Sequence, residues 1–268
     1  MNGHPFWSNG SVHPASTSIA RADDQGLLLG DGLFETLVAR ERRPLFLERH
    51  LRRLRRGIDA LEIVGTSDDE AIRRGIDELV EASGLVDSRV RITITPGPGP
   101  SPRERGDSPL TMITIAPLAP APSSVALCTV DWIRNERSPL AGIKSSSWGD
   151  NAMILRHATA KGFDNAILCD STGRLSECTT SNVFLVIDGE ILTPSLDSGC
   201  LPGIIREVLI ESGTARERDL HPSDLHDATE VFITSSTTDV VPVARIDEID
   251  FDVDGPLTLL ARSVIAAG

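Results

Sequence analysis

The sequence contains no tyrosine, and only two of its 26 basic residues are lysines, Lys144 and Lys161. It also has no uninterrupted apolar run of about 18 residues, the length that a membrane-spanning helix requires. The first ten residues, MNGHPFWSNG, have neither the basic region nor the apolar segment of a secretory signal. These absences argue against a membrane protein and predict a cytoplasmic location.

An excess of positive charge is absent as well. The formal net charge is −13 and the isoelectric point is near 4.9. This balance argues against a nucleic-acid partner, because duplex binding needs a clustered basic surface. The four cysteines, Cys128, Cys169, Cys178 and Cys200, have no C-x-x-C spacing, and the six histidines are scattered. We therefore expect reduced thiols and no metal site.

The composition is that of an ordinary globular protein, with 268 residues of which 40% are hydrophobic and 24% are charged. Alternating apolar residues predict strands, and apolar residues at three- and four-residue spacing predict helices. The predicted strands lie at 34–47 (around a turn at 41–43), 89–95, 111–118, 125–132, 165–169, 182–187, 191–193 and 230–235; the predicted helices lie at 48–63, 67–84 (capped by Ser67), 150–161, 204–212 and 256–267. This mixture predicts an α+β or α/β fold in two layers.

One segment has the composition of a linker between domains. In APLAPAPSS, residues 116–124, alternating prolines and alanines favour neither helix nor sheet. We therefore predict a smaller N-terminal α+β domain at residues 1–118, a linker at 119–124 and a larger C-terminal domain at 125–268.

The scarcity of lysine makes Lys144 conspicuous. An amine can lose its proton and attack a carbonyl, whereas a guanidinium stays charged at any physiological pH. Lys161 precedes Gly162 at a predicted helix end, where an arginine would serve equally well. Lys144 follows an apolar run and precedes a serine-rich turn, with no helix end to stabilise. A Schiff-base lysine is one interpretation of Lys144, and a surface remnant is the other.

Three other segments suit a pyridoxal phosphate site. Such a site needs an acid beside the pyridine nitrogen and a group of hydrogen-bond donors around the phosphate. Gly203 opens a predicted helix, so the amides of Ile204 and Ile205 are expected as N-terminal donors. TSSTTD, residues 234–239, supplies consecutive hydroxyls at a strand end. Glu177 lies in an otherwise uncharged stretch, where a carboxylate needs a cationic partner. The alternatives are a simple turn at Gly203, an exposed hydroxyl-rich loop and a solvent-facing Glu177.

The order of these motifs resembles that of a known family, the class IV or fold-type IV pyridoxal-phosphate enzymes. The family includes branched-chain aminotransferases, D-amino-acid transaminases, (R)-selective amine transaminases and aminodeoxychorismate lyases. The resemblance is carried by GDGLFET (30–36), HLRRL (50–54), AGIKSSSW (141–148), NAILCDSTGRLSECTTSNVFLVIDGEILTP (165–194), LPGIIRE (201–207) and TSSTTDVVPV (234–243). It implies a small and a large domain with the cofactor between them, and a homodimer whose sites borrow a loop from the partner.

The resemblance also implies roles for individual residues. Lys144 corresponds to the lysine that forms the internal aldimine and then moves a proton between substrate Cα and cofactor C4′. Glu177 corresponds to the partner of the pyridinium nitrogen. The residues expected at the phosphate and ring are Arg53, Leu201, Gly203, Ile204, Ile205, Ser236 and Thr237.

The sequence departs from the family pattern at two places. Relatives often have a tyrosine four or five residues after the lysine, where this chain has Trp148, either a cofactor contact or a core residue. D-amino-acid transaminases usually have a carboxylate-binding arginine where this chain has Pro96. We expect one of four other arginines to replace it by bidentate pairing: Arg103, Arg105, Arg134 or Arg137.

The resemblance favours a transaminase that moves an amino group between a small amino acid or primary amine and a 2-keto acid. TSSTTDVVPV leans toward D-amino acids or (R)-amines. The alternative is an aminodeoxychorismate lyase, which releases pyruvate and 4-aminobenzoate, and Thr36 in GLFET favours it. A protein that binds the cofactor without turnover is a third possibility, against which the retention of Lys144 with Glu177 argues.

Overall fold

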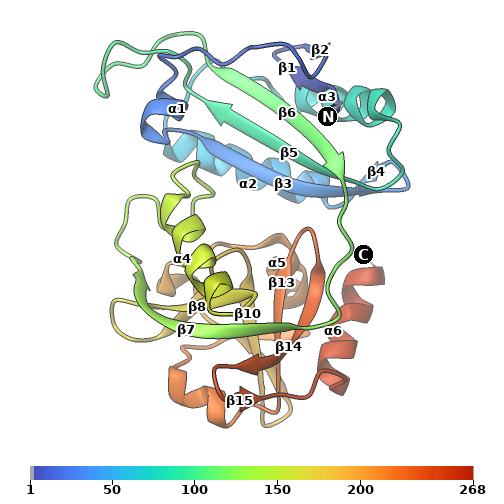
Figure 1. Ribbon diagram of the computed structural model, residues 1–268, viewed down its shortest axis with the longest axis vertical. Coiled ribbons are helices and arrows are strands. Elements are labelled where there is room, and N and C mark those ends of the chain that lie inside the picture. The colour runs from blue at the N-terminus through green and yellow to red at the C-terminus, as the bar shows by residue number, and fades with distance from the viewer. Residues whose placement is uncertain (1–2, 268) are drawn as a thin grey trace. The chain divides into compact units, whose positions relative to one another are not determined.

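In the computed structural model, which describes residues 3–267, the chain folds into two compact units (Figure 1). Unit 1 extends to Ala119 and also contains the later segment Ile143–Trp148. Unit 2 contains Pro120–Gly142 and the chain from Gly149 onward. The boundaries predicted from composition placed Ile143–Trp148 in the C-terminal half, and composition gave no sign of its return to unit 1.

Unit 1 is built on six antiparallel strands: β1 (Phe6–Ser8), β2 (Ser11–His13), β3 (Leu33–Arg40), β4 (Arg43–Pro44), β5 (Ser88–Thr95) and β6 (Leu110–Pro117). Their order in the sheet is β2-β1-β6-β5-β3-β4. Three helices accompany them: α1 (Gln25–Leu29), α2 (Leu47–Ala60) and α3 (Asp69–Ser83). The prediction of Ser67 as the cap of the second helix is wrong, because the Asp68 side chain accepts from the Ala71 amide.

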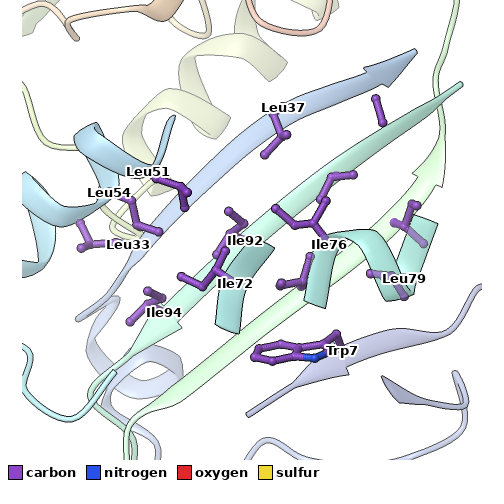
Figure 2. Close-up of a cluster of buried hydrophobic side chains, with 14 of the residues drawn as sticks. Trp7, Leu33, Leu37, Leu51, Leu54, Ile72, Ile76, Leu79, Ile92 and Ile94 are labelled. Atoms are coloured by element: carbon purple, nitrogen blue, oxygen red, sulfur yellow. The ribbon is translucent and has the colours of Figure 1, made fainter. Parts of the chain in front are cut away.

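The core of unit 1 lies between the sheet and helices α2 and α3, as Figure 2 shows. Leu51 and Leu54 come from α2, and Ile72 and Ile76 come from α3, at the spacing that places apolar side chains on one helical face. The strands contribute alternate residues, Leu33 and Leu37 from β3 and Ile92 and Ile94 from β5. The odd-numbered residues of β3, Glu35 included, therefore share the face that α2 covers, and the even-numbered residues belong to the other face of the sheet.

Unit 2 contains nine strands: β7 (Val125–Arg134), β8 (Asn165–Asp170), β9 (Leu175–Cys178), β10 (Asn182–Ile187), β11 (Glu190–Thr193), β12 (Ala215–Glu217), β13 (Glu230–Ser235), β14 (Asp239–Ile246) and β15 (Ile249–Asp250). Their order is β12-β11-β10-β13-β14-β7-β8-β9, with β15 paired to β14. The pairs β7–β8, β7–β14 and β11–β12 are parallel, and the other pairs are antiparallel.

The helical segments of unit 2 are α4 (Gly149–Ala160), η1 (Leu196–Ser198), α5 (Ile204–Glu211), η2 (Pro222–His226) and α6 (Pro256–Ala267). Helices α5 and α6 contact each other and strand β13, and α4 contacts β7 and β8. All five helices predicted from periodicity are present, and the α+β fold class is confirmed. The prediction missed α1 and the strands β1, β2, β9, β12, β14 and β15.

Across residues 3–267 no helix combines the length and apolarity needed to cross a bilayer. The same residues contain no group of three or more His, Cys, Asp or Glu side chains placed to hold a metal ion.

A packing prediction follows from Gly75 in α3. A Cβ atom at this position would lie 2.6 to 2.9 Å from three ring atoms of Trp7, which is 2% exposed. We expect Gly75→Ala to lower the free energy of unfolding by about 1 to 3 kcal/mol through overpacking, although alanine has the better helix propensity by about 1 kcal/mol. Urea denaturation monitored by circular dichroism measures the change.

Gly57→Ala in α2 is the matched control. The three atoms nearest to its Cβ would be side-chain atoms of Leu33, the closest at 3.0 Å, and the ends of that side chain can shift. The gain in helix propensity should then offset most of the crowding. Equal losses of stability in the two variants would contradict the packing argument.

Candidate active site

Lys144 is held at the start of β3 by the backbone. The Phe34 amide donates to the Lys144 carbonyl oxygen at 3.0 Å, and the Ser146 amide donates to the Gly32 carbonyl oxygen at 2.8 Å. Leu33 and Ser145 form the bridge between these two bonds. The lysine is thereby placed by main-chain hydrogen bonds to a strand that lies far away in sequence.

The glycines of GDGLFET make this approach possible. A Cβ at Gly32 would lie 2.5 Å from the Ile94 carbonyl oxygen and 3.2 Å from Ser146 Oγ. Gly30 has a φ of +69° and packs against the backbone of Ser147. The motif that carried part of the family resemblance is therefore the surface on which the lysine segment lies.

Two aromatic rings flank the Lys144 ammonium. Its Nζ lies 4.3 Å from the centroid of Phe34 and 4.9 Å from that of Trp148. The two rings meet edge to face with their centroids 5.2 Å apart. Trp148 thus contacts both Phe34 and the predicted catalytic amine. Whether it also contacts a cofactor stays a prediction.

The sheet face that carries Phe34 also carries Thr36 and Arg91. Strand register places Phe34 opposite Thr93 and Thr36 opposite Arg91. The Arg91 guanidinium carbon lies 3.9 Å from the Phe34 centroid. Sequence reasoning included Thr36 but missed Phe34 and Arg91, although the alternation in RVRITIT already placed Arg91 and Thr93 on one face.

Arg53, predicted to bind phosphate, is fixed by a buried carboxylate. Its Nε and Nη2 donate to the two oxygens of Glu35 at 2.7 Å each, a bidentate pair. His50 Nδ1 lies 2.7 Å from the same carboxylate. Glu35 and His50 are each 1% exposed and Arg53 is 9% exposed. Arg53 is therefore not on the solvated face of its helix, where Arg52 and Arg56 lie.

The charge of Glu35 is sustained by these partners. Burial by itself would raise the pKa of the Glu35 carboxyl, but the charge and hydrogen bonds of Arg53 and the hydrogen bond with His50 outweigh it. The pKa of Glu35 is consequently held well below its usual range. Glu35 is thus an anion that orients Arg53, a role for which the sequence gave no signal.

In unit 2, Glu177 on β9 is buried and engaged at both oxygens. Arg134 Nε lies 3.0 Å from Oε1, and the Leu201 amide donates to Oε2 at 3.1 Å. Asn182 Nδ2 donates to the Leu201 carbonyl oxygen at 2.9 Å. Glu177 therefore has a cationic partner within the protein, Arg134. Its pairing with a pyridinium nitrogen stays a prediction.

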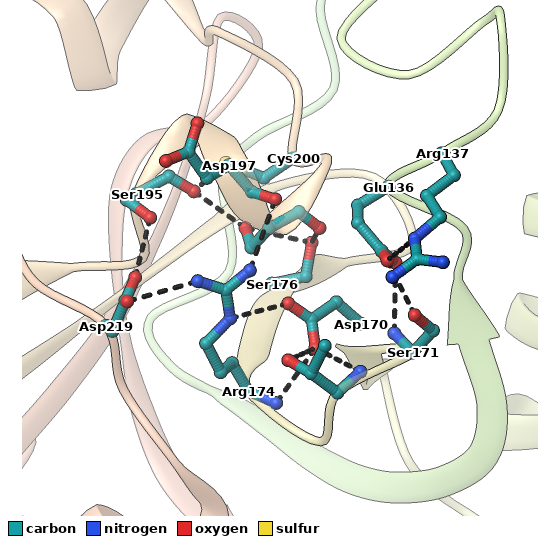
Figure 3. A network of polar contacts seen from close by, with 12 residues as sticks. Glu136, Arg137, Asp170, Ser171, Arg174, Ser176, Ser195, Asp197, Cys200 and Asp219 are labelled. Atoms are coloured by element: carbon teal, nitrogen blue, oxygen red, sulfur yellow. Dashed lines mark hydrogen bonds and ion pairs between the residues drawn. The ribbon is translucent and has the colours of Figure 1, made fainter.

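A polar network fixes the strand that carries Glu177 (Figure 3). Arg174, just before β9, pairs with Asp170 at 2.8 Å and with Asp219 at 3.1 Å, and also donates to the Asp197 carbonyl oxygen. Ser176 Oγ donates to the Ser198 carbonyl oxygen at 2.9 Å. These contacts connect β9 to the turn that precedes Leu201. They therefore hold in place the two segments that carry Glu177 and Leu201.

The start of α5 has the features expected of an anion site. Gly203 is its N-cap and supplies no side-chain acceptor, so the first-turn amides of Ile204 and Ile205 have no helical partner. A Cβ at Gly203 would lie 2.0 Å from Asn182 Oδ1, which excludes other residues there. At the end of β13, Ser235 Oγ bonds the hydroxyls of Thr237 and Thr238, and Ser236 lies among them.

The other arginines proposed for substrate binding lie in different surroundings. Arg105 pairs with both oxygens of Asp31 and also donates to the Leu61 carbonyl oxygen. The Arg137 side chain is 81% exposed and pairs with Glu136. Arg103 lies on an exposed loop. Like Arg134, Arg105 already has an acidic partner, and a role in substrate binding for any of the four stays a prediction.

The thiols beside these residues are unsuited to nucleophilic chemistry. Burial raises the pKa of Cys178, the neighbour of Glu177, far above its usual value. Burial also raises the pKa of Cys200, the neighbour of Leu201, to about 11. Because the thiolate is the reactive form, Lys144 is a better nucleophile candidate than either cysteine.

Comparison with known proteins gives a consistent family. The family model described as amino-transferase class IV matches residues 32–246. The chain is 26% identical to the aminodeoxychorismate lyase of Bacillus subtilis, over 92% of this chain and 88% of the relative. It is 27% identical to the D-alanine aminotransferase of Listeria innocua, over 85% of this chain and 82% of the relative. The predicted family is confirmed.

A solved structure shares the fold. The branched-chain aminotransferase of Thermoproteus uzoniensis superimposes with a TM-score of 0.92 at 24% identity, over 98% of this chain and 94% of that one. The names of these three similar proteins thus describe three different activities.

The Glu35–Arg53 pair generates a stability prediction. Glu35→Gln leaves the guanidinium buried without its carboxylate, so we expect a loss of about 3 to 5 kcal/mol in the free energy of unfolding. The lowered pKa means that the carboxylate stabilises the fold fully above the ordinary value of 4.5 and loses this effect as the pH falls toward the folded value. The advantage of the natural protein over Glu35→Gln should therefore shrink in acid, as denaturation at several pH values can measure.

Glu48→Gln is the control for this pair. The Glu48 side chain is 70% exposed and pairs with Arg73, so its loss should cost no more than about 1 kcal/mol. A deficit for Glu35→Gln that is equally small, or that stays constant through the acid series, would contradict the assignment.

Proposed function

Because the chain belongs to the class IV aminotransferases, a family that depends on pyridoxal phosphate, we propose that it transfers an amino group between a small amino acid or primary amine and a 2-keto acid. The observation that carries this proposal is the placement of Lys144. Backbone hydrogen bonds hold the Lys144 segment beside β3, and its amine lies beside two aromatic rings, in a chain where nearly every other basic residue is arginine.

The residues of the described chain suit pyridoxal phosphate. Lys144 supplies a primary amine for the aldehyde, and Glu177 supplies a buried carboxylate for the pyridinium nitrogen. The uncapped amides at the start of α5 and the hydroxyls of Ser236 and Thr237 suit a phosphate group. Thr234 Oγ1, beside them in sequence, is buried without a hydrogen-bond partner, which supports a polar ligand at this strand end.

When bound, pyridoxal phosphate acts as an electron sink that makes the substrate Cα–H bond acidic. Lys144 Nζ would hold the cofactor at its aldehyde carbon. Once displaced by a substrate amine, the Lys144 amine would be the base that takes the proton from substrate Cα. Phe34 and Trp148 limit the positions open to Nζ and exclude water from its surroundings.

Two ion pairs fix the groups that hold the cofactor. Glu35 and His50 orient Arg53, which would bind the phosphate. Arg134 compensates part of the charge of Glu177 and holds its carboxylate, which would pair with the pyridinium nitrogen. Leu201, whose amide donates to Glu177, would pack against the ring.

We lean to D-amino acids or (R)-amines, because TSSTTDVVPV is similar to the D-amino-acid transaminases and a D-alanine aminotransferase is among the relatives. Aminodeoxychorismate lyase is the second candidate. Thr36 in GLFET and the similarity to the Bacillus subtilis lyase favour it. The two differ in whether an acceptor keto acid is consumed. We further propose a cytoplasmic homodimer.

The proposal is tested by replacing each lysine in turn. Lys144→Arg keeps a cation beside Phe34 and Trp148 but cannot bond to the cofactor aldehyde. We expect it to abolish the visible absorbance of bound pyridoxal phosphate and lower turnover by at least about 1,000-fold, as for loss of a nucleophile. Lys161→Arg, at the only other lysine, should leave both unchanged. Absorbance spectra and single-turnover reactions without keto acid measure these effects.

The amine that bleaches the visible band identifies the branch of the family. D-alanine, L-leucine and (R)-1-phenylethylamine are added separately. Bleaching by one of them without an acceptor is half of a transamination. If none bleaches the band while aminodeoxychorismate yields pyruvate, the lyase is the correct assignment. Undiminished turnover in Lys144→Arg would refute both.

A further inference from the structure

The loop at residues 98–106, between β5 and β6, is folded around a buried glutamine. Gln25 is 2% exposed, and its Nε2 donates to the carbonyl oxygens of Ser101 at 2.7 Å and Glu104 at 3.1 Å. A Cβ at Gly99 would lie 2.1 Å from the same Nε2, so the loop backbone approaches the glutamine more closely than a larger residue would allow. This packing gives the loop a defined shape and a firm base for the side chains that it carries.

Arg105, near the end of this loop, joins three parts of unit 1. Its Nε and Nη2 donate to the two oxygens of Asp31 at 2.9 and 2.8 Å, and its Nη1 donates to the Leu61 carbonyl oxygen at the end of α2. The Arg105 side chain is 30% exposed and that of Asp31 is 19% exposed. Arginine suits this position because its planar fork can bind a carboxylate bidentately and a carbonyl oxygen at the same time, which an ammonium cannot do in a fixed geometry.

Asp31 lies in the middle of the turn that supports the lysine segment. Gly30, on one side, packs against the backbone of Ser147, and the Gly32 carbonyl oxygen, on the other, accepts from the Ser146 amide at 2.8 Å. Because both neighbours are glycines, Asp31 carries the one side chain through which a contact can hold the turn 30–32. Its carboxylate is bound from the far side by Arg105.

The pair is better suited to placing this turn than to stabilising the whole fold. A partly exposed ion pair contributes little to the free energy of unfolding. A bidentate pair nevertheless restricts direction as well as distance, so it limits where the turn can lie. If the turn moved, the Gly32 carbonyl oxygen would move away from the Ser146 amide, two residues after Lys144.

We propose that Arg105 is a positioning residue for Lys144: by binding Asp31, it holds the turn 30–32 against the backbone that follows the lysine. Arg105 thus acts through Asp31 and not by contact with the substrate. The inference rests on the proposed function for the chemistry of Lys144, and on the contacts of Arg105, Asp31 and Gly32 for its geometry.

Hydrogen exchange of the Ser146 amide, measured on the protein as isolated, tests the placement directly. We expect Arg105→Gln and Asp31→Asn each to speed this exchange by about 3- to 10-fold, because the turn that accepts the hydrogen bond is less restricted. The double variant should exchange no faster than either single variant, since both changes remove the same contact. Arg105→Lys should fall between the natural protein and Arg105→Gln.

Arg21→Gln is the matched control for the ion pair. Arg21 also binds an aspartate bidentately, with both distances to Asp23 at 2.9 Å, but it belongs neither to the loop nor to the turn. We expect exchange of the Ser146 amide in this variant to equal that of the natural protein. Thermal unfolding of every variant checks that the fold is retained.

A pair of cofactor forms then measures the effect on the lysine itself. Pyridoxal phosphate has an aldehyde that can bond to Lys144 with loss of water, whereas pyridoxamine phosphate has an amine and cannot. In titration calorimetry on protein from which the cofactor has been removed, Arg105→Gln should weaken binding of the aldehyde form by about 3- to 10-fold. Binding of the amine form should change less than about twofold, because Arg53 is fixed separately by Glu35.

Three results would each overturn the inference: unchanged exchange of the Ser146 amide in Arg105→Gln, effects of the two single variants that multiply in the double variant, or equal weakening of both cofactor forms. The proposed function can fail separately. If the natural protein binds no pyridoxal phosphate while Arg105→Gln still speeds exchange of the Ser146 amide, the proposed function is wrong and the positioning role stands.

Discussion

The arrangement around Lys144 depends on two backbone hydrogen bonds, from the Phe34 amide to the Lys144 carbonyl and from the Ser146 amide to the Gly32 carbonyl. They join a segment of the second half of the chain to the first residues of β3. Only glycine fits at position 32, because a Cβ would strike the Ile94 carbonyl oxygen. Main-chain bonds do not depend on side-chain identity, so the fold itself places the Lys144 backbone beside Phe34.

The alternation of β3 then separates two kinds of chemistry that are adjacent in sequence. Phe34 and Thr36 lie on the face that carries Lys144 and Arg91, whereas Glu35 contacts His50 and Arg53 of α2. A register shift of one residue would exchange these faces and bury the wrong groups. The ion pair under the strand therefore contributes to the accuracy of the site above it, because it penalises any such shift.

The sequence was sufficient for features that depend on local pattern. Helical periodicity located five helices, and the scarcity of lysine singled out Lys144 in a family that the comparisons confirm. It was insufficient where the neighbour is remote. Arg91 looks like an outward-facing charge in an alternating strand, as Arg89 truly is, and nothing beside Glu35 in sequence identifies its partners on α2. Only the packing of α2 under β3, and of Phe34 beside β5, distinguishes them. The cap at Asp68 was missed because Ser67 and Asp68 are equally good caps by type.

The acidic composition of the chain bears on how its buried cations are paired. The chain carries a net charge of −13, so acids are plentiful, and most buried cations have found one. Arg91 has no acid beside it among residues 3–267, and its contacts are the ring of Phe34 and the neutral Thr93 Oγ1. A ring attracts a cation only weakly, so the charge of Arg91 leaves a positive potential on the face of the sheet where the Lys144 ammonium also meets Phe34.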